Sequence, residues 1–449
     1  MSDKVDLVLR SQNVMTDIGD RPAAIAIKDG KIVGIGSFDQ KYDASEDVTV
    51  ENYLLPGVVD SHVHINEPGR TQWEGFESAT KAAAAGGVTT VIDMPLNSIP
   101  PTVNVAALAT KKEAATGKCS VDVGFWGGSI PGNVADLKPL LDQGVFGFKC
   151  FLLHSGVDEF PASSLDDLSD ALDVLSKENG LMVVHAEDSQ AIQRSAKPSS
   201  RDYAEFLASR PKGAENVAIA ELIEEARRTK ARVHVLHLSS GDSLALIRSA
   251  KEDGINITVE TCPHYLSLTA EEIADGATQY KCCPPIREKK NQDELWRGLE
   301  DGIIDQIVSD HSPCTEDLKL FDKGDFQAAW GGISSLQLGL SIIWTFGSER
   351  GIPLYKIVKW MSQNPAYLVG LQDKGSIAVG KDADIIEFDP NGTFSVDPKQ
   401  LFHKNHVTPY QGKILKGIVK KTWLRGNVIF KDGAHTGGPQ GKFLTRGIN

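Results

Sequence analysis

The sequence predicts an α/β fold, a (β/α)8 TIM-like barrel that carries a small β-sandwich domain built from both termini. Two observations predict it. Residues 56–372 alternate short apolar runs with helical patterns, as the strands and crossover helices of a parallel barrel do. Both ends of the chain carry β-rich runs separated by turn residues instead. With 449 residues, the chain is long enough for a barrel and a smaller domain.

The small domain is predicted to combine residues 1–55 with residues 373–449. The first segment contains the runs VDLVLRSQNVM, AAIAIKDGKIVGIG and DVTVENYLL, and the last contains GSIAVGKDADIIEFD and GIVKKTWLRGNVIFKDG. Asp29-Gly30 and Asp432-Gly433 are turn signals within these segments. Because the two ends resemble each other, we expect one β-domain, with the barrel inserted as a unit.

Eight apolar runs in the middle of the chain are the predicted barrel strands, at 58–65, 88–95, 121–128, 145–152, 181–187, 232–240, 256–263 and 304–313. Helical patterns such as GFESATKAAAAGG and AENVAIAELIEEARRTKA lie between most of them. An open doubly wound sheet is the alternative. It is disfavoured because no glycine-rich phosphate turn follows the first strand.

Composition excludes several classes of partner. The net charge is −13, and no polybasic run is present that would hold a nucleic acid or an anionic membrane. No secretory signal and no transmembrane-length apolar stretch is apparent. The six cysteines are too few and too irregular for a disulfide framework. We therefore expect a cytoplasmic protein that acts on a small molecule.

Polar residues recur at the ends of the predicted strands, where barrel enzymes place their catalytic groups. His62 and His64 are spaced so that both point to one face of a strand, as ligands of one metal ion would. Five strands together supply six metal-capable or acid–base groups: His62, His64, Lys149, His185, His237 and Asp310. His234 lies three residues from His237 and should face the other way, as a packed or helix-facing residue. His311 should point away from Asp310 and lie behind the ligands.

Lys149 is the most informative of these residues. It is flanked by Phe148, Cys150 and Phe151, and a buried lysine is rare unless it is paired or modified. A lysine that snorkels to the barrel rim is the alternative. Two divalent ions held by four neutral imidazoles need anionic ligands, and only Asp310 is at hand. A lysine carboxylated by carbon dioxide would supply a bridging carboxylate.

An ordered series of motifs resembles the cyclic amidohydrolases, a family that includes dihydroorotase, hydantoinase (dihydropyrimidinase) and allantoinase. The motifs are DSHVHINEPGR, KCF, VVHAED, HLSS, TCPHYL, KCCPPIR and SDHSPC, between about residues 54 and 390. The resemblance implies two metal ions bridged by carboxylated Lys149, with zinc first and cobalt, manganese or iron as alternatives. His62 and His64 would bind one ion, and His185 and His237 the other. Asp310 would be both ligand and general base. The resemblance also implies a homotetramer.

Asn66 favours one branch of this family. Dihydroorotases typically have an arginine here that grips the substrate carboxylate, and asparagine cannot replace a bidentate guanidinium. His154 stands where hydantoinases usually have a tyrosine, and Cys283 where dihydroorotases tend to have asparagine. The stretches NEPGRTQWEGF, DMPLNSIPPT and KCCPPIR together resemble allantoinases most. The predicted substrate-binding residues are Asn66, Asn97, His154 and Cys283.

The predicted reaction is hydrolysis of the hydantoin ring amide of allantoin to allantoate, as a step of purine degradation. A hydroxide that bridges the two ions would attack the ring carbonyl, and Asp310 would carry its proton to the departing nitrogen. The alternatives are a hydantoinase-like or dihydroorotase-like ring opening. A non-catalytic scaffold of the same fold is disfavoured because all six ligand positions are filled.

Overall fold

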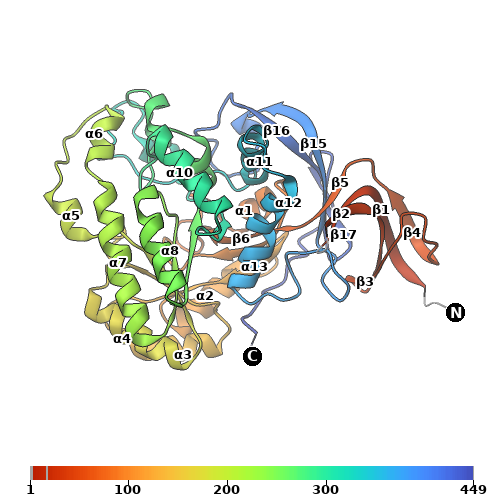
Figure 1. The fold of residues 1–449 in the computed structure, drawn as a ribbon, viewed down its shortest axis with the longest axis horizontal. Helices are drawn as coiled ribbons and strands as arrows, with labels where there is room; N and C mark the ends of the chain where they lie inside the picture. Colours follow the sequence, from red (N-terminus) through yellow and green to blue (C-terminus); the bar gives the residue numbers. More distant parts are fainter. Residues whose placement is uncertain (1–3, 17–18, 448–449) are drawn as a thin grey trace.

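The computed structural model describes residues 4–16 and 19–447, which form a barrel and a mostly antiparallel sheet beside it (Figure 1). Three parallel barrel strands form one sheet: β6 (Val58–Val63), β7 (Val88–Asp93) and β8 (Asp122–Phe125). The second sheet contains β9 (Gly127–Gly128), β10 (Phe148–Phe151), β11 (Leu181–His185), β12 (Arg232–Val235), β13 (Ile257–Thr261) and β14 (Gln306–Ile307). A parallel bridge between Val63 and His311 joins the last strand to the first. The predicted fold class is confirmed.

The hydrogen-bonded strands are shorter than the apolar runs that predicted them. The run 304–313 pairs only at Gln306–Ile307 on its ladder with β13, and the run 232–240 only at Arg232–Val235. Beyond these points the chain turns inward, with positive φ of 35° at His237 and 44° at Asp310. The carboxyl ends of the strands therefore leave the sheet and direct their polar side chains into the barrel mouth.

Helices cover the outside of the barrel (Figure 1). The longer ones are α1 (Phe76–Ala85), α2 (Val105–Ala115), α3 (Val134–Asp142), α4 (Leu165–Lys177), α7 (Lys212–Thr229), α8 (Leu244–Glu252), α10 (Lys289–Glu300) and α11 (Gly339–Glu349). The shorter ones are α5 (Ser189–Arg194), α6 (Tyr203–Ala208), α9 (Pro263–Ser267), α12 (Leu354–Val358) and α13 (Asn364–Leu368). Helix α4 shows why such segments are helical. Ser164 and Asp167 form a capping box at its start, and the buried residues Leu168, Ala171, Leu172 and Leu175 share one face.

The terminal sheet joins strands from both ends of the chain. Its order is β18-β17-β16-β15-β5-β1-β2-β3, and β4 pairs with β1. The amino-terminal strands are β1 (Val5–Thr16), β2 (Gly19–Lys28), β3 (Lys31–Gly36), β4 (Ala44–Thr49) and β5 (Tyr53–Pro56). The carboxy-terminal strands are β15 (Ile385–Ser395), β16 (Ile414–Leu424), β17 (Asn427–Lys431) and β18 (Ala434–His435). The two groups meet where β5 pairs with β15. A β-region made from both ends is confirmed, while its division from the barrel at residues 55 and 373 stays a prediction.

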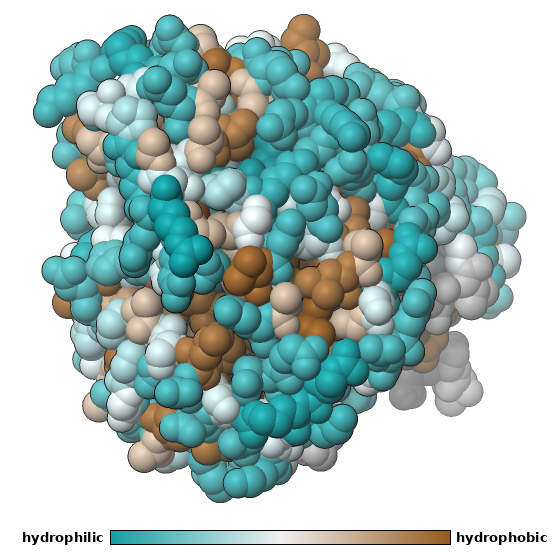
Figure 2. Space-filling view, turned by 60° about the vertical axis from the view of Figure 1, so that its left-hand side comes forward, coloured by the Kyte–Doolittle hydropathy of each residue, from teal (hydrophilic) through white to brown (hydrophobic). Residues whose placement is uncertain are grey.

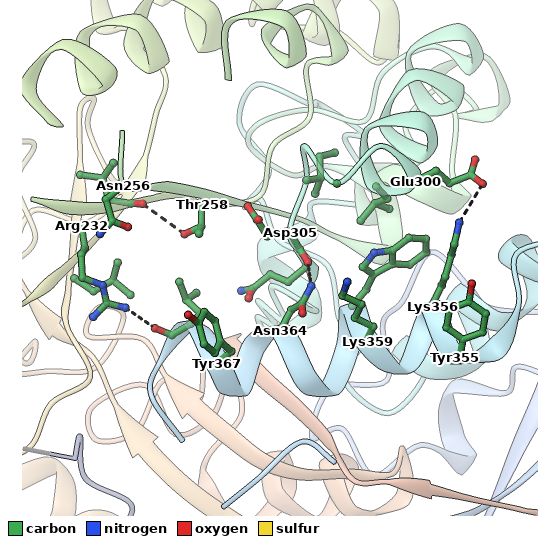
Figure 3. Close-up of a pocket in the computed structure, with 18 of the residues that line it drawn as sticks. Arg232, Asn256, Thr258, Glu300, Asp305, Tyr355, Lys356, Lys359, Asn364 and Tyr367 are labelled. Carbon is green, nitrogen blue, oxygen red and sulfur yellow. Dashed lines mark hydrogen bonds and ion pairs between the residues drawn. The ribbon is translucent and has the colours of Figure 1, made fainter. Parts of the chain in front are cut away.

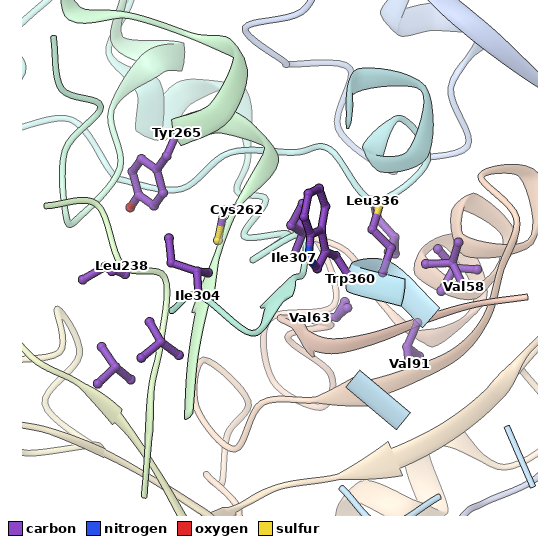
Figure 4. Packing of buried hydrophobic residues seen from close by; sticks show 14 of the residues in the cluster. Val58, Val63, Val91, Leu238, Cys262, Tyr265, Ile304, Ile307, Leu336 and Trp360 are labelled. Atoms are coloured by element: carbon purple, nitrogen blue, oxygen red, sulfur yellow. The ribbon is translucent and has the colours of Figure 1, made fainter. Parts of the chain in front are cut away.

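One large hydrophobic cluster lies between the barrel strands and the helices around them. Figure 4 shows Val58 and Val91 of β6 and β7 in this cluster, with Ile307 of β14 and Trp360 of the segment Lys359–Gln363. On the face shown in Figure 2, hydrophilic residues predominate and apolar residues form small separate groups. Across residues 4–16 and 19–447, no helix has the length and apolar character needed to cross a membrane.

A buried ion cluster ties the barrel to the terminal sheet. Lys374 Nζ lies 2.7 Å from Asp122, 2.8 Å from Asp382 and 2.6 Å from Asp384, and its side chain is only 2% exposed. Asp122 belongs to β8 and Asp384 immediately precedes β15. The lysine therefore neutralises carboxylates from both parts of the chain.

We expect Lys374→Met to lower the free energy of unfolding by about 3–5 kcal/mol, since it leaves the buried Asp384 carboxylate without a cationic partner. Asp122 keeps Arg425 as a partner, and Asp382 keeps Lys31. Urea unfolding followed by circular dichroism measures the loss. Lys31→Met is the matched control, because Lys31 pairs with Asp382 and Asp373 but is 40% exposed. Its loss should be about 1 kcal/mol or less. Equal losses in the two variants would contradict the account.

Candidate metal centre

The first part of the site lies where β6 ends. His62 is in the strand and His64 follows it, so both imidazoles reach the barrel mouth. His62 Nε2 is 3.1 Å and His64 Nε2 is 3.4 Å from Asp310 Oδ1. The three residues each offer one ligand atom, and these atoms lie within 4.8 Å of one another. This group could hold a metal ion.

Lys149 projects from β10 into the same space. Its side chain is 1% exposed, and Nζ lies 3.3 Å from His62 Nε2. Within the described part of the chain, no carboxylate lies in ion-pair distance of Nζ. Burial lowers the pKa of Lys149 to about 8. The amine is thus next to the predicted ligands, buried and without an acidic partner.

His185 and His237 complete the set from β11 and the segment after β12. Their ring centroids are 4.5 Å apart, and the His237 ring lies 5.5 Å from that of His62. His234 and His237 both point inward, although residues three apart on a regular strand face opposite sides. The positive φ of His237 makes this possible. The structure therefore brings together all six residues that the sequence singles out as ligands.

Three of the four imidazoles have a lowered pKa, which favours the neutral form that binds metal ions, and His62 is the exception. Burial lowers the pKa of His64 to about 3, and it also lowers the pKa of His185 and His237. Burial acts the same way on His62, but the Asp310 carboxylate outweighs it and raises the pKa of His62. For Asp310 itself, burial is outweighed by the charge of His62, which holds its pKa well below the ordinary value.

The donor set fits a pair of divalent metal ions. His237 Nδ1 and His64 Nδ1 are buried without a hydrogen-bond partner, which is costly for polar atoms. Neutral imidazole and carboxylate are donor types that zinc and similar ions accept. Metal ligands of this kind therefore explain the arrangement better than packing does.

Two buried carboxylates hold the histidines in place, and sequence reasoning missed both. Glu260 on β13 lies 2.5 Å from His62 Nδ1 and 3.0 Å from His234 Nε2. Glu187 lies 2.7 Å from His185 Nε2 and pairs with Arg210. Such partners fix the orientation of metal-binding imidazoles. A signal was available for Glu187, which stands two residues after His185 in VVHAED.

The expectation that only one of His234 and His237 faces the barrel interior is wrong. His234 bonds to Glu260, and the backbone N–H of His237 donates to the same carboxylate at 3.3 Å. The strict alternation of a strand does not apply, because β12 ends at Val235. His311 bonds to Glu74, whose carboxylate lies 3.0 Å from Nε2, so its side chain points away from Asp310 as expected.

Glu260→Gln should weaken binding of the ion at His62 by about 10–100-fold, because the partner that orients the ring is lost. Competition with a colorimetric chelator measures the affinity. Glu74→Gln is the matched control, since Glu74 also bonds a buried histidine, His311, that is not a predicted ligand. An equal loss of affinity in both variants would mean that Glu260 acts only through folding.

A cavity of about 350 Å³ opens above this cluster at the carboxyl ends of the strands. His64, Lys149, His185, His237 and Asp310 line it, as do three of the predicted substrate-binding residues, Asn97, His154 and Cys283. Asn66 does not line it. This side chain is 1% exposed, its Nδ2 donates to the Pro313 carbonyl at 3.4 Å, and its Oδ1 has no partner. Arg210 and Trp330 also line the cavity and were not foreseen.

A larger cavity of about 890 Å³ lies at the opposite, amino-terminal ends of the barrel strands (Figure 3). Arg232, Asn256 and Thr258 line one side, and Lys359 and Tyr367 another. None of the predicted ligand or substrate residues reaches it. The smaller cavity is therefore the candidate active site, since the side chains able to do chemistry converge there.

Comparison with known proteins agrees with this geometry. A profile of the Amidohydrolase family matches residues 53–429, so the chain belongs to the amidohydrolase family. One similar relative is the allantoinase of Streptomyces avermitilis, which is 55% identical over 449 residues and covers 99% of this chain and 100% of its own. Another is the allantoinase of Saccharomyces cerevisiae, 46% identical over 94% of this chain and 95% of its own. The predicted resemblance is confirmed.

Solved structures place the fold among hydantoinases. The L-hydantoinase (dihydropyrimidinase) from Arthrobacter aurescens superposes with a TM-score of 0.93 at 31% identity, covering 98% of this chain and 100% of that one. The sequence identity to this neighbour is lower than that to the allantoinases. The structural likeness therefore supports the barrel fold, and the sequence relatives carry more weight on the substrate.

Proposed function

We propose that this protein is an allantoinase, which hydrolyses the hydantoin ring amide of allantoin to give allantoate. One observation carries the proposal. His64, His185, His237, Lys149 and Asp310 line one cavity, with His62 beside Asp310 beneath it, in a chain that matches an allantoinase along its full length at 55% identity. A hydantoinase-like ring opening is the second candidate, favoured by the structural neighbours.

Two divalent ions complete the proposed site. His62 and His64 would hold one ion and His185 and His237 the other, with carboxylated Lys149 and Asp310 as the anionic ligands. Zinc suits this donor set best, while cobalt, manganese and iron also accept it. The pKa of about 8 leaves a larger neutral fraction of the Lys149 amine near neutral pH than an ordinary lysine has. Carbon dioxide reacts with that neutral form.

The chain's own residues handle the proton. Bound ions would polarise the ring carbonyl and make the attacking water nucleophilic near neutral pH. Asp310 accepts the proton of this water and delivers it to the ring nitrogen as the C–N bond breaks. Its pKa, well below the ordinary value, keeps it unprotonated before the reaction. One water is consumed: its oxygen joins the ring carbonyl carbon to give a carboxyl group, which loses its proton to solvent, and the released ring nitrogen becomes an NH2 group.

Residues around the cavity would select the substrate. Asn97, His154 and Cys283 line it and are proposed to contact the hydantoin ring or the ureido group. Asn66 lies behind the surface, so its proposed role requires that its unpaired Oδ1 becomes reachable when substrate binds. The proposal also includes a cytoplasmic homotetramer, whose subunits combine a barrel of residues 56–372 with a β-sandwich of residues 1–55 and 373–449.

Product analysis tests the proposed reaction. Metal-loaded protein and allantoin are followed by carbon NMR, and the expected change is conversion of one ring carbonyl to a carboxylate with the ureido carbon retained. Release of the ureido group as urea, or an unchanged spectrum with both ions bound, would contradict the proposal.

A further inference from the structure

A second group of metal-capable side chains shares Asp310 with the proposed pair of ions. Cys262 follows β13, and His264 lies in the short helix α9. Cys262, His264 and Asp310 each offer one ligand atom, and these atoms lie within 4.8 Å of one another. Cys262 and His264 are both fully buried, and the thiol of Cys262 is free. Neither residue has a role in the proposed reaction.

His264 is the observation that points to a ligand. Both of its ring nitrogens are buried and have no hydrogen-bond partner. An unsatisfied buried polar group costs about 1–3 kcal/mol. The ring packs edge-on against Tyr265, with centroids 4.2 Å apart, which satisfies neither nitrogen. A cation coordinated by His264 would remove this cost for one of them.

The donor types indicate which cation would fit. A thiolate, an imidazole and a carboxylate together suit thiophilic ions such as zinc or cadmium, whereas calcium and magnesium prefer oxygen ligands. Tetrahedral bonds of about 2.0–2.3 Å place ligand atoms about 3.5 Å apart. The ligand atoms lie within 4.8 Å of one another, so any pair that is farther apart than the tetrahedral spacing would have to approach as the ion binds.

We propose that Cys262, His264 and Asp310 form a third cation site, which takes a thiophilic divalent ion and inhibits the enzyme. The thiol of Cys262 loses its proton to solvent as the metal–sulfur bond forms, and no electron is transferred. The ion then occupies the Asp310 carboxylate, which can no longer accept a proton from the attacking water. The inhibition rests on the proposed function, but binding of the ion does not.

Cadmium added to the enzyme that already holds two ions tests the site. Equilibrium dialysis counts the ions, and ultraviolet absorption detects the sulfur-to-cadmium charge-transfer band. No cysteine belongs to the proposed ligands of the catalytic pair, so that band reports a different site. We expect a third ion with this band in the native protein. Cys262→Ser should lose both, and His264→Ala should weaken binding by about tenfold or more, since even outer partners are worth 10–100-fold.

Cys283→Ser is the matched control, because Cys283 is the half-buried thiol that lines the catalytic cavity. It should keep the third ion and the band. A band that persists in Cys262→Ser, a band lost in Cys283→Ser, or the absence of a third ion would each overturn the proposal. Because the band does not depend on turnover, it tests the site even if allantoin is not the substrate.

Discussion

Lys149→Ala is expected to abolish activity and to leave the protein unable to hold both metal ions. The metal ions should contribute several kcal/mol to transition-state stabilisation, and each 1.36 kcal/mol is worth tenfold in rate. We therefore expect initial rates to fall by about a thousandfold or more. The metal content, measured by atomic emission, should fall in parallel. Lys149 has no carboxylate partner in the described structure, so its loss should not unfold the chain.

Rescue separates a bridging carboxylate from a merely structural lysine. In Lys149→Ala, the space vacated by the side chain can admit a short carboxylate such as acetate or propionate, which should restore part of the activity and the metal content. Lys149→Gln is the control, since its side chain fills the space, carries no negative charge and leaves no room for the acid. Equal rescue of both variants, or full activity of Lys149→Gln, would contradict the role of a carboxylated Lys149.

Asp310→Asn should lower kcat by about 10²–10⁴-fold, the usual contribution of a positioned general base. The asparagine keeps the shape of the side chain but cannot accept the proton of the attacking water. KM should change far less than kcat, because Asp310 acts in the transition state rather than in substrate binding. Steady-state kinetics with a parallel metal analysis measure the effect.

Ser312→Ala is the comparison variant for Asp310. Its hydroxyl donates to Asp310 Oδ1 at 2.9 Å, so its removal disturbs the orientation of the carboxylate but leaves the carboxylate itself. The loss in kcat should therefore be smaller than for Asp310→Asn. A native kcat in Asp310→Asn with both ions bound would show that another group carries the proton.

The predicted ligands could be found from the sequence because they follow apolar strand runs. The carboxyl ends of parallel strands meet at one end of a barrel, so His62, Lys149 and Asp310 had to come close whatever the details of the loops. The terminal strands could be predicted in the same way, because the apolar residues of strands repeat with a different period from those of the barrel helices.

The carboxylates that orient the histidines were less accessible to sequence reasoning. Glu260 reaches His62 across 198 positions of the sequence, and only the closed barrel brings them together. The inward direction of His234 was missed because the prediction extended the strand to His237. The chain leaves strand geometry before that residue, so both histidines can point inward. The burial of Asn66 depends on how its loop packs against Pro313, which no period in the sequence reveals.

The most direct measurement is a set of parallel initial rates for the metal-loaded protein on allantoin, hydantoin, dihydrouracil and dihydroorotate. The account predicts that allantoin is hydrolysed fastest by a wide margin. A faster rate on hydantoin or dihydrouracil would keep the metal site but contradict the substrate. No hydrolysis of any ring with two ions bound would contradict the proposed enzyme activity on these four rings.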